Sequence, residues 1–214
     1  MKWLGIIALA LLAACGRGVP ETARIVVAGD SVMAWNRIAG AAVADRLSAR
    51  LGQPVGDVSL SFARITGGQG PLNIPRQLAG LRPDLVVLNG GANDLSAGCD
   101  CSDCGPVLDR LITRDATSGA IPALVSDLRG RGAEVIWADY YTSPRYAGTI
   151  CEAPYKELEA RLTRLAATDP GMTLVDMDDV FSPDDLSLFA PDRTHPSQKG
   201  SARMADEIVR VLGR

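Results

Sequence analysis

The sequence RIVVAGDS, residues 24–31, joins a short apolar run to a glycine and two polar residues. The run RIVVA is too short for a typical helix, and its isoleucine and valines favour a strand that is buried on both faces. Apolar residues at helical spacing follow over residues 33–51, which predicts a helix. A buried strand, a glycine turn and a helix form the first half of a βαβ unit, in which helices cover a parallel sheet.

The same alternation continues to the end of the chain. Four further apolar runs predict strands, and segments of helical periodicity lie between them. The predicted strands are residues 24–28, 55–60, 85–89, 134–138 and 172–175, and the predicted helices are residues 33–51, 74–81, 121–128, 154–167 and 197–212. We therefore expect a three-layer α/β/α sandwich with a five-stranded parallel sheet. Ligands of such proteins bind beyond the carboxyl ends of the strands.

The composition limits the possible functions. The 214 residues carry a formal net charge of −3, with 22% charged and 47% hydrophobic residues, which is ordinary for a globular domain. No run of Lys or Arg forms the basic surface that nucleic-acid binding needs, so we expect no nucleic-acid partner. No internal repeat is visible, and residues 23–214 are predicted to form one domain.

The N-terminal segment has a different character. A positive residue, an apolar run and two small residues predict a secretory signal peptide over residues 1–14. The tetrad LAAC, residues 12–15, resembles the bacterial lipoprotein box, and this resemblance implies lipidation of Cys15 and a tether over residues 15–22. Gly16 then favours the periplasmic side of the outer membrane over the inner membrane. Ordinary cleavage that leaves Cys15 as an unmodified thiol is the alternative.

Four cysteines remain beyond Cys15, and they are Cys99, Cys101, Cys104 and Cys151. An even number in an exported protein predicts two disulfides, and the sequence does not choose among the three pairings. The loops after the third and fourth strands flank the same edge of the expected sheet. We therefore expect Cys151 to pair with one of the other three, and the remaining two to staple their loop beside a substrate pocket. A four-cysteine zinc site is the alternative.

His195 is the only histidine, and it lies just before the last predicted helix. Asp192 precedes it by three residues, so a tight turn could bring the carboxylate to the imidazole Nδ1 and fix its tautomer. Taken alone, this segment is more typical of a solvated surface turn.

Three further segments follow predicted strands. In GDS, residues 29–31, Ser31 could be a nucleophile or a plain helix cap. Gly67 could bring a backbone N–H close to a ligand, and Asn93 could donate its amide to an oxyanion, although plain loops explain both segments equally well. The carboxyl ends of parallel strands meet at one edge. That edge would hold a nucleophile, a base and oxyanion donors, which are the parts that acyl transfer requires.

In their order along the chain, these motifs resemble those of the SGNH hydrolases, also called the GDSL family, over about residues 24–212. The resemblance implies a flavodoxin-like fold and an esterase that uses no metal and no cofactor. It implies a catalytic triad of Ser31, Asp192 and His195, and an oxyanion hole made of Ser31, Gly67 and Asn93. Phe62 stands where the family often has an asparagine, a departure that concerns loop support and not chemistry.

Three functions stay open at this point. The first is a serine-dependent ester hydrolase acting on small acyl esters, O-acetyl glycans or lipids of the cell envelope. An envelope O-acyltransferase would use the same residues, and a non-catalytic binding lipoprotein would keep only the fold. Tyr140, Tyr141 and Tyr146 either line the pocket or are ordinary rim residues, and Trp35 has the spacing of a core residue. We expect a monomer that is held at a membrane through Cys15.

Overall fold

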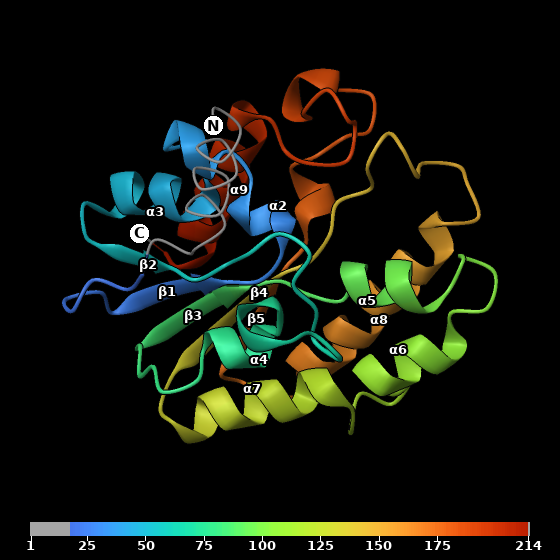
Figure 1. The fold of residues 1–214 in the computed structure, drawn as a ribbon, viewed down its shortest axis with the longest axis horizontal. Coiled ribbons are helices and arrows are strands. Elements are labelled where there is room, and N and C mark those ends of the chain that lie inside the picture. The colour runs from blue at the N-terminus through green and yellow to red at the C-terminus, as the bar shows by residue number, and fades with distance from the viewer. Residues whose placement is uncertain (1–17, 214) are drawn as a thin grey trace, which may run out of the picture.

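A computed structural model of the chain describes residues 18–213. Its centre is a parallel sheet with the strand order β2-β1-β3-β4-β5 (Figure 1). The strands are β1 (Ile25–Ala28), β2 (Val55–Asp57), β3 (Leu85–Leu88), β4 (Glu134–Ala138) and β5 (Met172–Val175). In the register of the sheet, Val27 of β1 lies between Asp57 of β2 and Val87 of β3. The predicted five-stranded sheet is confirmed, and its order is that of flavodoxin-like folds.

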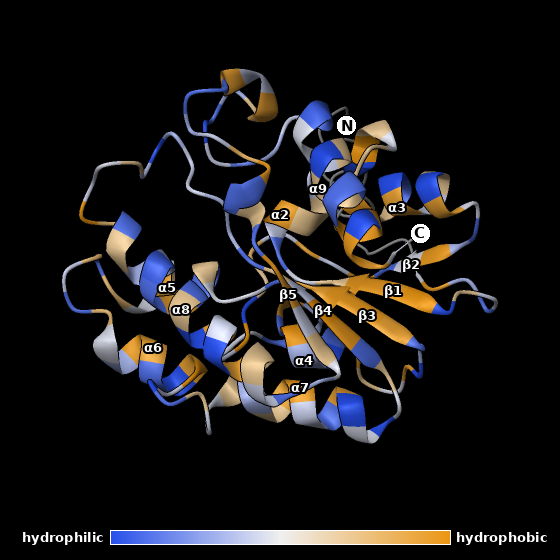
Figure 2. Cartoon of the chain, turned by 180° about the vertical axis from the view of Figure 1, so that it is seen from behind, coloured by the Kyte–Doolittle hydropathy of each residue, from blue (hydrophilic) through white to orange (hydrophobic). Residues whose placement is uncertain are grey.

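Helices cover both faces of the sheet (Figure 1). One layer contains α3 (Val43–Leu51) and α9 (Gln198–Val211), and the other contains α4 (Ile74–Gln77), α5 (Ala92–Gly98), α6 (Gly105–Leu111), α7 (Ala120–Gly130) and α8 (Glu152–Thr168). Strand side chains alternate between the layers, so Val26 packs with the second group and Val27 with the first. Figure 2 shows the apolar strands between helices that carry hydrophilic residues. The predicted α/β/α layering is confirmed.

The segment that was expected to be one helix over residues 33–51 is broken. It consists of α2 (Ser31–Ala34), a 3₁₀ turn η1 (Arg37–Ala39) and α3. Asn36 has φ 65° and Gly40 has φ 63°, both in the left-handed region, so the chain changes direction on either side of η1. Ile38 consequently faces solvent and is 91% exposed. The continuous apolar stripe predicted for this helix is therefore wrong.

The cysteines form two disulfides, Cys99–Cys104 and Cys101–Cys151. The first closes the connection between α5 and α6, and the second joins that connection to the residue before α8. One bond within the loop and one bond to Cys151 is the arrangement that the sequence predicted. All four thiols are oxidised, so the zinc alternative does not apply.

The domain begins earlier than the sequence indicated. Gly18 forms an antiparallel bridge with Asp57, and Val19 packs where a side chain at Gly56 would otherwise lie. The later part of the expected tether is thus docked on β2. The signal peptide and Cys15 lie outside the described residues. Within residues 18–213, no helix is long and apolar enough to cross a bilayer.

Candidate active site

Three side chains that are far apart in the sequence form a continuous hydrogen-bonded path. The Oγ of Ser31 lies 2.8 Å from Nε2 of His195, and Nδ1 of His195 lies 2.6 Å from Oδ2 of Asp192. Ser31 is the first residue of α2, directly beyond β1, and the other two precede α9. This is the geometry of a nucleophile, a base and the carboxylate that orients the base. The structure therefore brings together the predicted triad residues.

A tight turn holds Asp192 in place. Its Oδ1 accepts the backbone N–H groups of Thr194 and His195, each at 3.0 Å. Burial by itself would raise the pKa of Asp192, but the hydrogen bonds from His195 and Thr194 outweigh it and lower that pKa below its usual value. Asp192 thus remains an ionised partner for an imidazolium.

The backbone before the serine is clamped by two buried amides. Gln77 accepts the Gly29 N–H and donates to its carbonyl, while Asn89 accepts the Asp30 N–H and donates to its carboxylate. Gly29 has φ 129°, and a Cβ there would come within 2.0 Å of Asn89 Oδ1. The glycine of the GDS motif is required because only a residue without a side chain fits against this amide.

Trp35 lies flat against the imidazole of His195. The ring centroids are 3.8 Å apart and the planes differ by 4°. The sequence prediction that Trp35 is a core residue is wrong, because the left-handed Asn36 ends the helical stripe immediately after it. The signal that could have revealed this was Gly40, a helix-breaking residue within the apparent stripe. Stacking fixes the plane in which Nε2 meets Ser31 Oγ.

Two of the three residues predicted to supply oxyanion donors, Ser31 and Asn93, line the cavity. Asn93 lies in the same cavity as Ser31 and uses one amide N–H to donate to the Ala63 carbonyl at 3.0 Å. A primary amide has two N–H groups, so one is left for a ligand. The N–H of Ser31, at the first position of α2, has no acceptor within its helix. Gly67, in contrast, is not among the residues that line the cavity.

The loop after β2 reaches the cavity at Ser61 and Phe62, six and five residues before Gly67. The Ala63 N–H donates to the Leu60 carbonyl and closes a turn, within which Phe62 has φ 67° and a 77% exposed ring. Further along, the buried carboxylate of Asp94 accepts the N–H groups of Ile65 and Thr66. These bonds tie the loop to the first turn of α5.

Tyr140 connects two of the loops at the site. Its hydroxyl donates to Oδ2 of Asp30 at 2.5 Å and accepts the Ala92 N–H at 3.1 Å. Burial and the adjacent Asp30 raise the pKa of Tyr140 well above its usual value, so the phenol keeps its proton. Burial also raises the pKa of Asp30, against the effect of the hydrogen bonds that it accepts. Tyr140 thus ties the nucleophile loop to the loop that carries Asn93.

These residues surround a cavity of about 400 Å³. Aromatic rings and charged side chains share its wall, and they are Trp35, Phe62, Tyr140, Tyr141, Tyr146, Tyr155, Arg145, Glu152, Lys156 and Glu159. All three loop tyrosines therefore line the cavity. A second hollow of about 220 Å³ is lined by the four disulfide cysteines and shares Tyr146 and Tyr155 with the first. The stapled loop thus lies one layer of side chains behind the cavity wall.

The carboxylates that could bind a metal ion are not those of the triad. Among the described residues, the carboxylates of Asp139, Glu159 and Asp176 form one group close enough to share an ion. None of the triad residues belongs to this group.

One family model matches most of the chain. The model of the GDSL-like Lipase/Acylhydrolase family matches residues 27–203. No curated protein matches the sequence.

Solved structures of similar fold include TesA, with 20% identity and a TM-score of 0.63 over 88% of this chain and 97% of that one. A putative lipolytic protein of the G-D-S-L family from Desulfitobacterium hafniense has 18% identity and a TM-score of 0.66 over 88% and 99% of the two chains. Axe2, an acetylxylan esterase from Geobacillus stearothermophilus, has 16% identity and a TM-score of 0.64 over 92% and 96%. At these identities the likeness shows a shared fold.

Proposed function

Because this chain belongs to the GDSL-like lipase/acylhydrolase family, we propose that it hydrolyses carboxylic esters through an acyl-enzyme formed on Ser31. The observation that supports this assignment is the path of hydrogen bonds from Ser31 Oγ through both nitrogens of His195 to Asp192. A serine hydroxyl is a weak nucleophile until a base takes its proton, and His195 is placed to do so.

The reaction then proceeds in two halves. His195 accepts the Ser31 proton as Oγ attacks the ester carbonyl, and Asp192 stabilises the imidazolium that forms. The tetrahedral intermediate collapses, the bond to the alcohol oxygen breaks, and His195 returns the proton to the leaving alkoxide. Water, activated by the same imidazole, attacks the acyl-enzyme and releases the carboxylic acid and free Ser31.

The oxyanion of each tetrahedral intermediate needs donors. We assign this role to the Ser31 N–H and to the free amide N–H of Asn93. Removing one oxyanion donor typically costs about 10²–10³ in kcat.

The cavity favours a short acyl group on a polar alcohol. Its volume of about 400 Å³ is at the small end of ligand pockets. Tyrosine rings suit the faces of a sugar, and the side chains of Arg145 and Glu152 can form hydrogen bonds with its hydroxyls. We therefore favour O-acetyl glycans over long-chain lipids as substrates, in the manner of the acetylxylan esterase that shares this fold.

We further propose that the enzyme works in the bacterial cell envelope, held at a membrane by a lipid on Cys15. The support is the lipoprotein-like tetrad at residues 12–15 and the pair of disulfides, since such bonds persist in exported proteins. The ester substrate would then be an envelope glycan or lipid.

The test is hydrolysis of p-nitrophenyl esters from acetate to palmitate by the full-length protein in mild detergent. We expect the highest kcat/KM with acetate or butyrate, and a loss of at least about 10³-fold in the Ser31→Ala variant. Ser102→Ala removes an equally small hydroxyl that does not line the cavity and should keep full activity.

Two outcomes would count against the proposal in different ways. Equal activity in the Ser31→Ala variant would disprove the role of the serine. A maximum at palmitate would leave that role intact and disprove the preference for short acyl groups.

A further inference from the structure

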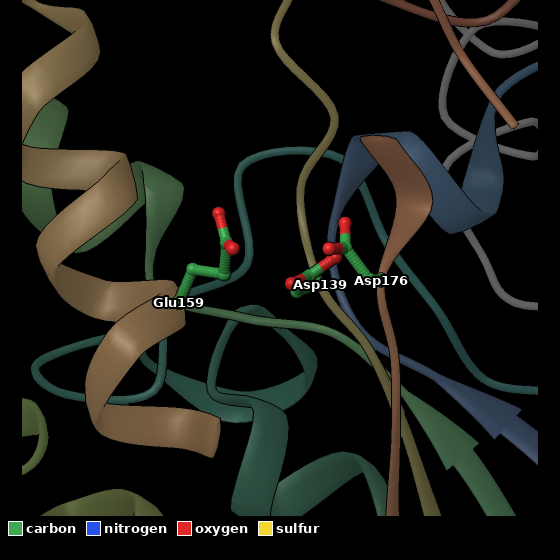
Figure 3. Close-up of side chains that lie close together, drawn as sticks. All are labelled: Asp139, Glu159 and Asp176. Atoms are coloured by element: carbon green, nitrogen blue, oxygen red, sulfur yellow. The ribbon is translucent and has the colours of Figure 1, made fainter. Parts of the chain in front are cut away.

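Three carboxylates converge beside the catalytic cavity, outside the triad. Asp139 follows β4, Asp176 follows β5, and Glu159 reaches them from α8 (Figure 3). One oxygen of each can be chosen so that all three lie within 4.8 Å of one another. The group therefore joins two strand ends to the helix that packs beside them.

Asp139 is the unusual member of the group. It is only 1% exposed, and while its Oδ1 accepts the Met177 N–H at 2.9 Å, its Oδ2 is buried without a hydrogen-bond partner. Burial, together with the charges of Asp176 and Glu159, raises the pKa of Asp139 to about 8. A buried carboxylate oxygen without a partner is costly, and proteins rarely retain one without a ligand or a role.

The neighbouring Asp178 differs from Asp139, because both of its carboxylate oxygens have hydrogen-bond donors. Its oxygens accept the N–H and the hydroxyl of Thr142, and Lys156 also donates to it. The ammonium of Lys156 donates to Glu159 as well, at 2.9 Å. The hydrogen bonds of Lys156 thus go to Asp178 and Glu159, and the Oδ2 of Asp139 is left out of them.

We propose that Asp139, Asp176 and Glu159 bind a hard divalent cation, Ca²⁺ or Mg²⁺. Carboxylate oxygens are the ligands that these ions prefer, and the site offers no thiol or imidazole that would favour zinc or copper. Oxygens up to 4.8 Å apart can coordinate one ion, because ligands on opposite sides of a Ca²⁺ ion are about 5 Å apart.

The cation has a route to the site and a structural effect there. Glu159 lines the catalytic cavity, so an ion can reach the group from that side, and water can complete its coordination. Once bound, the ion neutralises the repulsion among three carboxylates and ties β4 and β5 to α8. Since α8 also supplies Tyr155 and Lys156 to the cavity wall, the ion holds that wall in place. It takes no part in the chemistry at Ser31.

The test is calorimetric titration of chelator-treated, full-length protein with CaCl₂ and, separately, with MgCl₂. We expect saturable binding of one equivalent of at least one of the two ions. We also expect that ion to raise Tm by about 5 °C or more at a hundredfold excess over Kd, whereas NaCl of equal ionic strength does not.

Variants locate the ion. Asp139→Asn keeps the shape of the side chain, relieves the repulsion and should fold, but it should weaken binding at least tenfold. Asp127→Asn makes the same chemical change on α7, at a carboxylate paired with Arg131, and should bind as the parent does. Absence of saturable binding with both ions, or equal affinity in Asp139→Asn, would overturn the proposal. Neither readout depends on esterase activity.

Discussion

Trp35 and His195 belong to different segments of the chain and meet face to face at the site. In the proposed mechanism, His195 must keep one ring orientation while it accepts a proton from Ser31 and passes it to the leaving group. Its Nδ1 is held by Asp192, but a single hydrogen bond leaves the ring free to rotate about that axis. The indole of Trp35 removes this freedom by covering one face of the imidazole.

We expect Trp35→Ala to lower kcat by about threefold to tenfold, since aromatic stacking is worth about 0.5–1.5 kcal/mol. KM for a small ester should change less than kcat, because the indole acts on the base and not on the acyl group. Trp35→Phe keeps a flat ring and should restore most of the rate. The measurement is steady-state kinetics on p-nitrophenyl acetate. A rise in KM at constant kcat in both variants would instead make Trp35 a substrate contact.

Among the site residues, the sequence predicted those contacts that depend on a short spacing along the chain. Asp192 and His195 meet because a turn of three residues joins them, and the GDS motif places Ser31 at a strand end. Gly67 was assigned to the oxyanion hole through a motif, and composition alone cannot tell which residue of a loop faces a ligand. The path of this loop depends on hydrogen bonds from Ile65 and Thr66 to Asp94, which join segments that are almost thirty residues apart.

The two disulfides differ greatly in the length of chain that they close. Cys99–Cys104 spans 5 residues and Cys101–Cys151 spans 50. A crosslink removes more conformational freedom from the unfolded chain when its loop is longer. The bond to Cys151 therefore stabilises the fold, whereas the inner bond mainly shapes the turn between α5 and α6.

Replacing Cys101 and Cys151 together by serine should lower the free energy of unfolding by about 4 kcal/mol. The matched double variant at Cys99 and Cys104 should lose only about 2 kcal/mol. Unfolding in guanidinium chloride, followed by circular dichroism, measures both values. Equal losses from the two pairs would contradict a mechanism based on loop length.

Among the elements, strands were predicted more accurately than helices. The runs at residues 134–138 and 172–175 coincide with β4 and β5, because a strand buried on both faces must be apolar throughout. Apolar residues keep helical spacing throughout residues 33–51, so the spacing gives no sign of the two points at which the helix is broken. α5 and α6 escaped prediction because each has only 7 residues and depends on disulfides and packing for its stability.

The whole fold follows from the repetition of one unit. Each apolar run is followed by a helix, and right-handed crossovers then require a parallel sheet with both faces covered. The strand order 2-1-3-4-5 was implied by the resemblance to one family, since many orders satisfy the same pattern. The order matters for function because it brings the ends of β1, β3 and β4 together under one cavity.

The proposed lipid on Cys15 would hold the whole molecule at a membrane. In a bacterial host, we expect the full-length protein to sediment with membranes and the Cys15→Ser variant to remain in the soluble fraction, because the variant cannot carry a thioether-linked lipid. Fractionation followed by immunoblotting of the protein checks this. The Ser31→Ala variant should sediment like the parent, and a Cys15→Ser variant that still sediments with the membranes would contradict anchoring through Cys15.

The docking of Gly18 on the last residue of β2 sets how far an anchored molecule can move. Two residues lie between Cys15 and Gly18, and even a fully extended chain spans no more than about 11 Å over these three Cα–Cα steps. A domain of this size has a radius of gyration of about 16 Å, so it cannot turn freely above a bilayer. Asp57 lies at the same edge of the sheet as Ser31, and this edge would therefore face the lipid surface. An enzyme anchored through Cys15, as proposed, would sample a layer only about as deep as its own diameter, and its substrates would be the esters that enter that layer.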